Sequence, residues 1–253
     1  WASVSMAAAP WALGAAALAG GVLLALRWPW QWRLAGAPLL LPLLLWQAPR
    51  PAPGQFELLA ADVGQGNAVI VRTARHTLVY DAGPRYSLES DAGHRVLVPL
   101  LRALGERVDM LVLSHRDSDH TGGARAVLAM QRGATLLSSI EEGHELQGAR
   151  TAMRCQAGQR WTWDGVDFSV LHPLPADYAA PAKPNALSCV LRVQAGDASA
   201  LLAGDIEAPQ EQALLARGAD LAADVLLVPH HGSRTSSSLA FLQAVSPRWA
   251  LVQ

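Results

Sequence analysis

The feature that most restricts the fold of this chain is a ten-residue run, Ser114 to Gly123. It follows a short apolar segment and contains His115, Asp117, Asp119 and His120 within six residues. Alternate residues of an extended segment point to the same side, so the first three share a side, and His120 adjoins the start of the next helix. The run therefore predicts a metal site that can serve two cations.

A solvated polar loop, with one aspartate capping the following helix, is the simpler alternative. It would explain an aspartate at the helix start but neither of the flanking histidines. Gly122 and Gly123 favour the metal site, because residues without a side chain let a helix pack close to the ligands.

Three other apolar runs end in residues of the same chemical types. Thr77–Tyr80 is followed by Asp81, 200–204 by Asp205, and 225–229 by the pair His230 and His231. In α/β architectures ligands gather outside the carboxyl ends of strands. We therefore expect these four strand ends to meet in one cleft.

Runs typical of strands alternate with runs typical of helices after residue 55. The expected strands are 56–62, 68–73, 77–80, 110–113, 168–171, 189–193, 200–203 and 225–228. The expected helices are 95–104, 124–130, 209–215 and 239–245. This alternation predicts an α/β fold in which helices cover sheets.

Residues 1–47 are expected to form a transmembrane or interfacial helical stub at the end of a membrane channel region. Residues 2–26 are uncharged and, at roughly 20 residues, long enough to cross a bilayer as a helix. Residues 27–33 combine arginine with tryptophan, as is typical of the headgroup layer. The run 34–46 is short and contains two prolines, so it crosses at a tilt, re-enters or lies at the surface. A cleavable signal peptide fits less well, because no charged segment precedes the apolar run.

The proline-rich residues 48–54 are expected to be a linker, and 55–253 a globular domain. We expect this domain to be truncated at its C-terminal end, because the chain stops within the apolar run 249–252. If both apolar runs span, the arginines between them mark the cytoplasmic side. The domain would then be extracytoplasmic.

Two further properties limit the function. A formal net charge of -1 argues against the broadly basic surface that grips duplex DNA through its phosphates, so any contact with nucleic acid is local. Cys155 and Cys189 are the two cysteines. They form one disulfide in an oxidising compartment or remain two buried thiols, and the sequence leaves both open.

Several motifs together resemble the metallo-β-lactamase superfamily, whose hallmark is an His-x-His-x-Asp-His loop; here Asp117 replaces the second histidine. The more specific resemblance is to the C-terminal domain of ComEC, the DNA-uptake channel of naturally competent bacteria. It rests on the 114–123 run together with Asp62-Val63-Gly64-Gln65-Gly66, Asp81-Ala82-Gly83-Pro84, Leu202-Ala203-Gly204-Asp205-Ile206-Glu207 and Val228-Pro229-His230-His231-Gly232-Ser233.

This resemblance implies an αββα sandwich that holds one or two divalent ions, manganese or zinc. The implied metal ligands are His115, Asp117, Asp119, His120, Asp205 and His231. Asp119 and His230 are the implied catalytic residues, and the implied supporting residues around the ligands are Asp81, Asp62, Asn185 and Ser188. The chain departs from the family pattern in having Asn67 where aspartate is common, and only His172 near the position of the third histidine.

The resemblance also implies a function. The domain would be a metal-dependent hydrolase, a nuclease that degrades the non-transported strand during natural transformation. Its partners would be single-stranded DNA, the membrane and other competence proteins, in a multi-pass inner-membrane protein with a periplasmic hydrolase domain. The alternatives are a DNA-guiding domain without catalysis and a hydrolase of small lactones, thioesters or lactams. The serines of 233–238 either cap the helix at 239, the preferred interpretation, or hold phosphate.

Overall fold

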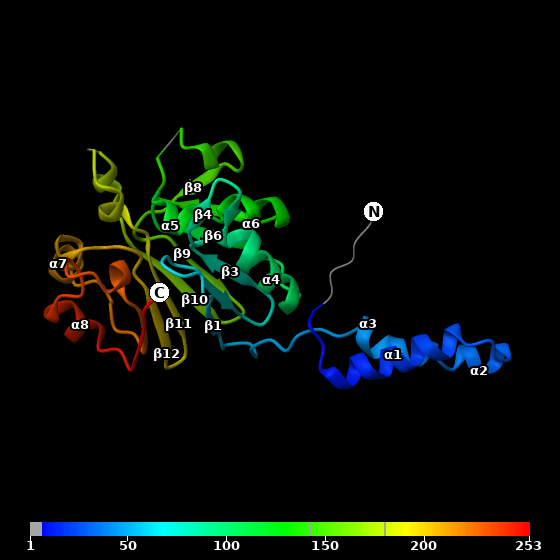
Figure 1. Ribbon diagram of the computed structural model, residues 1–253. Coiled ribbons are helices and arrows are strands. Elements are labelled where there is room, and N and C mark those ends of the chain that lie inside the picture. Colours follow the sequence, from blue (N-terminus) through cyan, green and yellow to red (C-terminus); the bar gives the residue numbers. More distant parts are fainter. Residues whose placement is uncertain (1–6, 142, 180) are drawn as a thin grey trace. The chain divides into compact units, whose positions relative to one another are not determined.

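The computed structural model describes residues 7–141, 143–179 and 181–253, which divide into two compact units. The first unit comprises Trp1–Pro49 and Pro99–Glu106. Its helices are α1 (Trp11–Ala25), α2 (Trp30–Leu34), α3 (Ala37–Leu44) and most of α4 (Val98–Leu104) (Figure 1). Gly20 of α1 lies against Gly36, where an added Cβ would come within 2.6 Å of the Gly36 carbonyl oxygen. The absence of a side chain at Gly20 therefore allows this close approach.

The prediction of a transmembrane segment over residues 2–26 is not supported. Residues 2–6 lie outside the described part, and α1 contains 15 residues before the chain becomes extended at Leu26. A helix of this length rises about 22 Å, whereas the hydrocarbon core of a bilayer is about 30 Å thick. Among the described residues, no helix has both the length and the apolar character that a membrane crossing requires.

The second unit, Arg50–Val98 with Arg107–Gln253, contains two sheets. Within the described residues each has six strands. The first sheet has the order β1-β2-β3-β6-β7-β8, with bounds Glu57–Ala60, Val69–Arg72, Thr77–Tyr80, Met110–Leu113, Thr135–Ser138 and Ala152–Arg154. The second has the order β14-β13-β12-β11-β10-β9, with bounds Trp249–Leu251, Val225–Leu227, Ala198–Leu202, Val190–Ala195, Val166–His172 and Arg160–Trp163.

Helices and a small ribbon complete the unit. The α-helices are α5 (Ser118–Thr121), α6 (Ala124–Met130), α7 (Ala208–Ala216) and α8 (Leu239–Val245). A π-helical turn, η1 (Gly93–Leu97), precedes α4, and β4 (Arg85–Ser87) pairs with β5 (Ser90–Asp91). The 3-10 turns are η2 (Glu145–Gly148), η3 (Pro175–Tyr178), η4 (Pro184–Leu187) and η5 (Pro229–Gly232). In Figure 1, α5 and α6 lie beside the first sheet, and α7 and α8 beside the second.

Strand alternation explains the layers. Leu202 packs between the two sheets with Tyr80 and Phe168, whereas its neighbour Leu201 faces the other way, toward Leu214 of α7 and Phe241 of α8. Successive side chains of a strand point to opposite faces, so the second sheet is buried on both sides. The mixed α/β sandwich expected from the sequence is therefore confirmed.

Parallel pairing determines where the polar strand ends lie. β3, β6 and β7 run parallel in the first sheet, and β12, β13 and β14 run parallel in the second. The residues that follow β3, β6, β12 and β13 consequently leave the carboxyl ends of parallel strands. Asp81, His115, Asp205 and His230 come from these four ends.

A disulfide connects the two sheets beside this edge. Cys155 directly follows β8, Cys189 directly precedes β11, and their sulfur atoms are bonded, with the Cα atoms 6.1 Å apart. Both residues are fully buried. Of the two states that the sequence leaves open, the structure has the disulfide.

Asp164 ties together two hairpin turns at the opposite edge. Its carboxylate accepts hydrogen bonds from the Thr73 hydroxyl at 2.7 Å, the Arg75 amide at 2.7 Å and the Arg75 Nε at 2.9 Å, and lies 3.0 Å from His76 Nδ1. The side chain is 1% exposed. Burial alone would raise the pKa of Asp164, but the hydrogen bonds from Thr73, His76 and Arg75 hold it well below its usual range.

We expect Asp164→Asn to lower the free energy of unfolding at pH 7 by about 2 kcal/mol, because an amide cannot replace charge-assisted acceptors. A carboxyl group with a depressed pKa stabilises the fold above the pKa of the unfolded chain, about 4, and loses this effect as the pH falls. The difference between wild type and variant should therefore shrink below about pH 4. Urea unfolding across this range measures it, with the exposed Asp167→Asn as control; equal stabilities at pH 7 would refute the role of Asp164.

Candidate metal centre

The buried carboxylate of Asp81 fixes the loop that carries the predicted ligands. Its Oδ1 accepts a hydrogen bond from the Ser114 amide at 2.6 Å, and its Oδ2 accepts one from the Ser114 hydroxyl at 2.8 Å. Oδ2 also lies 2.8 Å from Nδ1 of His120. Because Nδ1 is engaged in this way, the ring of His120 presents Nε2 to the centre of the site.

A first group of ligand atoms comprises His115, His120 and Asp205, whose ligand atoms all lie within 4.8 Å of one another. All three side chains are buried, and the two imidazole rings are 4.1 Å apart between centroids. His120 Nε2 is 3.2 Å from Asp205 Oδ1. These residues come from both sheets, so the site lies where the sheets' edges face each other.

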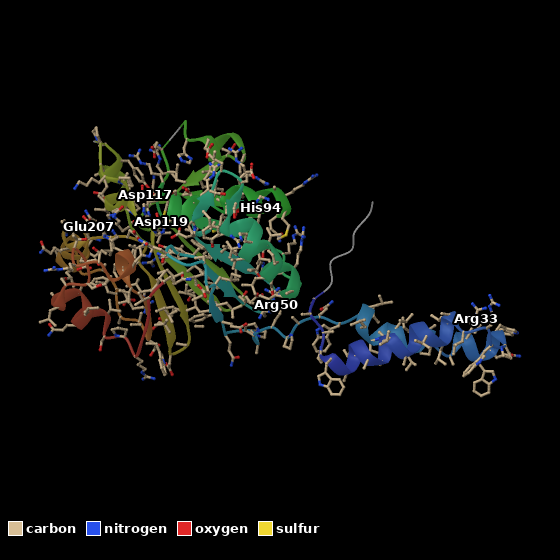
Figure 2. The ribbon with its side chains drawn as sticks, viewed as in Figure 1. Arg33, Arg50, His94, Asp117, Asp119 and Glu207 are labelled. Atoms are coloured by element: carbon tan, nitrogen blue, oxygen red, sulfur yellow. A yellow bond between two sulfur atoms is a disulfide. The ribbon has the colours of Figure 1, made fainter. Side chains whose placement is uncertain are left out.

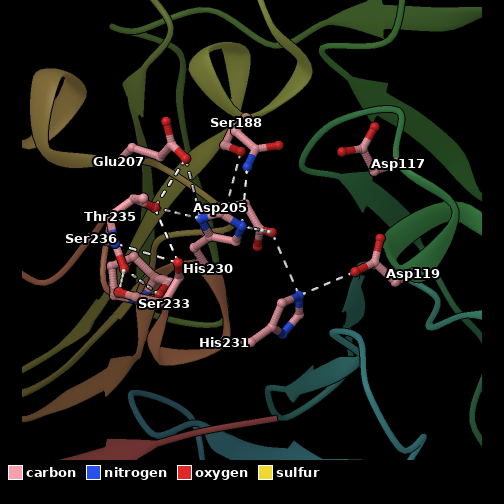
Figure 3. Close-up of polar contacts among 12 residues, drawn as sticks. Asp117, Asp119, Ser188, Asp205, Glu207, His230, His231, Ser233, Thr235 and Ser236 are labelled. Atoms are coloured by element: carbon pink, nitrogen blue, oxygen red, sulfur yellow. Dashed lines mark hydrogen bonds and ion pairs between the residues drawn. The ribbon is translucent and has the colours of Figure 1, made fainter.

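Asp119, His120 and His231 form a second group with the same spacing. His231 Nε2 lies 3.3 Å from Asp119 Oδ2 and 3.5 Å from Asp205 Oδ2 (Figure 3). The other ring nitrogen, Nδ1, donates to the main-chain oxygen of Gln253 at 2.9 Å. Asp205 thus faces His120 with one oxygen and His231 with the other, which is the arrangement that a bridging carboxylate needs.

The buried atoms of these groups lack hydrogen-bond partners. Within the described residues, Nε2 of His115, His120 and His231 and Oδ1 of Asp205 are buried and make no hydrogen bond. Buried polar atoms are nearly always paired, and here four orphaned atoms belong to the same two groups. Imidazole nitrogens and carboxylate oxygens are ligands for zinc and manganese, so the residues present fit a divalent cation.

The carboxylates strongly favour positive charge at this point. Burial would lower the pKa of His120, but the charge of Asp81, the nearby Asp205 carboxylate and the contact of Asp81 with Nδ1 raise it to about 10. The nearby Asp119 carboxylate raises the pKa of His231. In turn, the His231 ring, 3.3 Å away, lowers the pKa of Asp119 to about 2. A divalent cation would satisfy the same carboxylates in place of these protons, because metal binding competes with protonation of its ligands.

Asp117 is the predicted ligand that lies least within the site. Its side chain is 44% exposed, and Oδ2 is 3.5 Å from His115 Nε2. Figure 3 shows it apart from Asp205 and His231, and Figure 2 shows it beside Asp119 at this edge of the domain. It precedes α5, yet its side chain makes no capping hydrogen bond to any residue that the structure describes. The capped-loop alternative therefore does not account for Asp117.

His230 is held at the side of the site by residues that the sequence did not single out. Nδ1 is 3.1 Å from the Thr235 hydroxyl and 3.5 Å from Glu207 Oε1, and the Thr235 hydroxyl donates to Glu207 at 3.0 Å. Nε2 points the other way, 4.0 Å from Asp205 Oδ2 (Figure 3). His230 and His231 both have a φ of 52°, and such strain in residues other than glycine occurs mainly at functional sites. In the sequence, only the motif of residues 202–207, which ends at Glu207, pointed to that residue.

The predicted supporting residues differ in their positions. Ser188 is buried, accepts the Asp205 amide at 3.1 Å and lies 3.4 Å from His115 Nδ1. Asn185 approaches His230, with Nδ2 3.4 Å from Nε2. Asp62 is exposed instead, and its carboxylate accepts the Gly64 amide at 3.3 Å.

The turn after Asp62 reaches the ligand loop through its backbone. An added Cβ at Gly66 would come within 2.3 Å of the Asp119 carbonyl oxygen, and the Asn67 amide donates to that oxygen at 3.3 Å. This is why Asp62, at the far side of the turn, is not at the ligands. Gly122 has a similar role, because a Cβ there would lie 2.1 Å from the Arg85 amide.

Two other predictions concern residues outside the ligand groups. His172 ends β10, as expected, and its Nε2 lies 2.8 Å from the Ala186 carbonyl oxygen, so it does not replace the third histidine. Ser238 accepts the Phe241 amide at 3.4 Å. The serine run therefore provides the cap of α8, as preferred from the sequence.

A polar cavity of about 360 Å³ opens at the site. Its lining includes four of the six candidate ligands and the first histidine of the tandem pair: Gln65, Asp117, Asp119, Asn185, Asp205, His230, His231, Gly232 and Ser233. A substrate oxygen in this cavity would therefore meet carboxylates and imidazoles rather than an apolar wall.

The fold and the site together define a mixed α/β domain of the metallohydrolase type. Residues 61–252 match the model of the metallo-β-lactamase superfamily, and the chain belongs to this superfamily. At 16% identity and a TM-score of 0.51, it is similar in fold to MEM-A1, a subclass B3 metallo-β-lactamase from a soil metagenome library, over 79% of this chain and 92% of that one.

The relatives with higher identity include a competence protein. The chain is 44% identical to Competence protein ComA of Neisseria gonorrhoeae over 75% of this chain and 26% of the relative. It is 31% identical to ComE operon protein 3 of Bacillus subtilis over 79% of this chain and 28% of the relative. The resemblance to the metallo-β-lactamase domain of ComEC-type proteins is thus confirmed, and the chain spans about a quarter of the length of these relatives.

We expect Asp205→Asn to weaken zinc or manganese binding by about 100-fold, because the substitution removes a buried carboxylate that faces both histidines. Asp117→Asn should weaken it by less than about 10-fold, since that side chain is half exposed and touches one ligand. Competition with a chelating fluorophore measures both dissociation constants, with the exposed His94→Ala as control. Equal effects of the two aspartate variants would contradict this assignment of the ligands.

Proposed function

We propose that this domain is a divalent-metal-dependent phosphodiesterase that cleaves single-stranded DNA and degrades the strand that is not transported during natural transformation. The observation that carries the proposal is the convergence of four orphaned ligand atoms, two of them from residues that line an open polar cavity, Asp205 and His231. The names of the relatives, among them Competence protein ComA, supply the biological context.

We propose that the ion or ions, zinc or manganese, are held by His115, His120, His231, Asp119 and Asp205, with Asp117 at the rim. A divalent cation supplies the Lewis-acid charge that stabilises the attacking and leaving oxygens of a phosphodiester during in-line displacement.

We assign roles toward the substrate to two side chains, the ligand Asp119 and its neighbour His230. Asp119 is ionised at neutral pH, as an aspartate ordinarily is, and a third of its side chain is exposed toward the cavity. We assign it as ligand and proton acceptor for the attacking water. His230 reaches the same cavity with Nε2, while Thr235 and Glu207 hold Nδ1. We assign the imidazolium form of His230, in which both ring nitrogens carry protons, to donate a hydrogen bond from Nε2 to a substrate oxygen.

The setting of the domain is part of the proposal. We propose that residues 1–47 associate with the inner membrane, that residues 48–54 link them to the domain, and that the domain of residues 55–253 faces the periplasm within a multi-pass DNA-uptake channel. The Cys155–Cys189 disulfide supports this placement, because disulfides persist in oxidising compartments. Other competence proteins would be its partners there.

A DNA-guiding domain without catalysis is the rival proposal. Asn67 favours it, because this buried amide stands beside the ligand loop where the family pattern commonly has an aspartate. The orphaned ligand atoms favour the enzyme instead, since a purely guiding domain does not need buried lone pairs directed at one point.

We expect the purified protein with manganese or zinc to cleave a 5′-labelled single-stranded 30-mer, and a chelator to abolish cleavage. His120→Ala should reduce the rate by about 1,000-fold or more, because it removes the ligand shared by both groups. His230→Asn should lower kcat by about 100-fold, as expected for one lost hydrogen-bond donor, while the metal content stays unchanged. Denaturing gels give the rates, and plasma mass spectrometry gives the metal content.

The outcomes separate the candidate functions. Binding of the 30-mer without metal-dependent cleavage would replace the nuclease with the guiding domain. Hydrolysis of lactone, thioester or lactam substrates, with the 30-mer left intact, would indicate the small-molecule hydrolase.

A further inference from the structure

A second, larger cavity lies beside the candidate metal centre. Its volume is about 500 Å³, and its polar lining includes His115, Arg116, Glu141, Arg154 and Tyr178. His115 is a candidate metal ligand, and η4 lines both cavities, Asn185 one and Pro184 and Leu187 the other. The two cavities are therefore neighbours beside η4.

In the second cavity, the guanidinium group of Arg154 lies over the Tyr178 ring. The guanidinium carbon of Arg154 lies 4.9 Å from the centroid of the Tyr178 ring. The Tyr178 hydroxyl donates to the Cys155 carbonyl oxygen at 2.6 Å, and Cys155 is fixed by its disulfide. Aromatic rings and guanidinium planes held in this way are the surfaces on which unpaired nucleobases stack.

Arg116 lines the same cavity as Arg154 and Tyr178. It follows the ligand His115 directly, and its guanidinium pairs with the Glu141 carboxylate. The two side chains are 47% and 51% exposed. Exposed ion pairs contribute little to stability, so a phosphate, which a guanidinium can bind with two hydrogen bonds, can displace Glu141 at small cost.

We propose that this second cavity binds the nucleotide next to the cleaved phosphodiester of single-stranded DNA, its base against Arg154 and Tyr178 and its phosphate at Arg116. This inference rests on the proposed function and explains how the domain would select single-stranded DNA as its substrate. A base stacked within a duplex cannot enter the cavity, whereas an unpaired base can. The cavity therefore accounts for a preference for single strands in a domain without a broadly basic surface.

Binding is measured by fluorescence anisotropy of a labelled dT12 oligonucleotide with phosphorothioate linkages, which resist cleavage, in the presence of manganese. Arg154→Ala should raise the dissociation constant about 10-fold, within the range for loss of one stacking partner. Glu141→Gln should lower it about threefold, because it releases Arg116 and removes an anion that faces the phosphate. A gain in affinity cannot result from misfolding.

Two controls make the test specific. Arg248→Ala removes an exposed arginine that pairs with Asp224 just before β14, at the opposite ends of the parallel strands, and should leave binding unchanged. A blunt 12-base-pair duplex should bind wild type and Arg154→Ala equally. Unchanged dT12 binding by Arg154→Ala and Glu141→Gln would overturn the proposal, as would an equal loss for the duplex.

Failure of this inference is distinguishable from failure of the proposed function. The anisotropy assay reads the second cavity even if the protein cleaves no DNA. Where cleavage occurs, Arg154→Ala should raise KM for the 30-mer and leave the hydrolysis of bis(p-nitrophenyl) phosphate unchanged, because this small diester needs the metal cavity alone. A lower rate with the small diester would place Arg154 in the metal centre and refute the separate subsite.

Discussion

The site depends on the buried carboxylate of Asp81, which accepts hydrogen bonds from the Ser114 amide and hydroxyl and lies 2.8 Å from His120 Nδ1. These contacts anchor the start of the ligand loop to the end of β3 and orient the ring of His120. Without these contacts, the start of a loop that carries several carboxylates and imidazoles would not be held in one conformation. The same residue therefore links the order of the first sheet to the geometry of the proposed ligands.

The parts of the fold that could be predicted are those that depend on local pattern. The strands of 77–80 and 110–113, and the helices of 124–130 and 239–245, have the bounds expected from apolar spacing. The convergence of Asp81, His115, Asp205 and His231 was predictable, because each follows an apolar run and parallel strands end at the same edge. The short strands β7, β8, β9 and β14, at or next to the sheet edges, were missed, since three or four residues carry little signal.

The supporting network of the site could not be predicted, because it is made of contacts between distant segments. Thr235 reaches Glu207 across 28 positions, and His231 reaches the main chain of Gln253 across 22. The position of Asp62 could not be predicted either. The motif of residues 62–66 was recognised, but it contacts the ligand loop through its backbone at Gly66, while the Asp62 carboxylate accepts the Gly64 amide instead.

The negative charge of the metal cavity makes a bound cation necessary. The cavity contains Asp117, Asp119 and Asp205, which would repel a DNA phosphate, so only a cation held by these side chains makes the cavity a place for a phosphodiester.

The most direct test of the metal centre is anomalous X-ray diffraction from crystals loaded with manganese or zinc. The account predicts one or two anomalous peaks at about 2.0–2.3 Å from His115 Nε2, His120 Nε2 and the oxygens of Asp205. Metal that binds elsewhere, with no peak among these atoms, would contradict it.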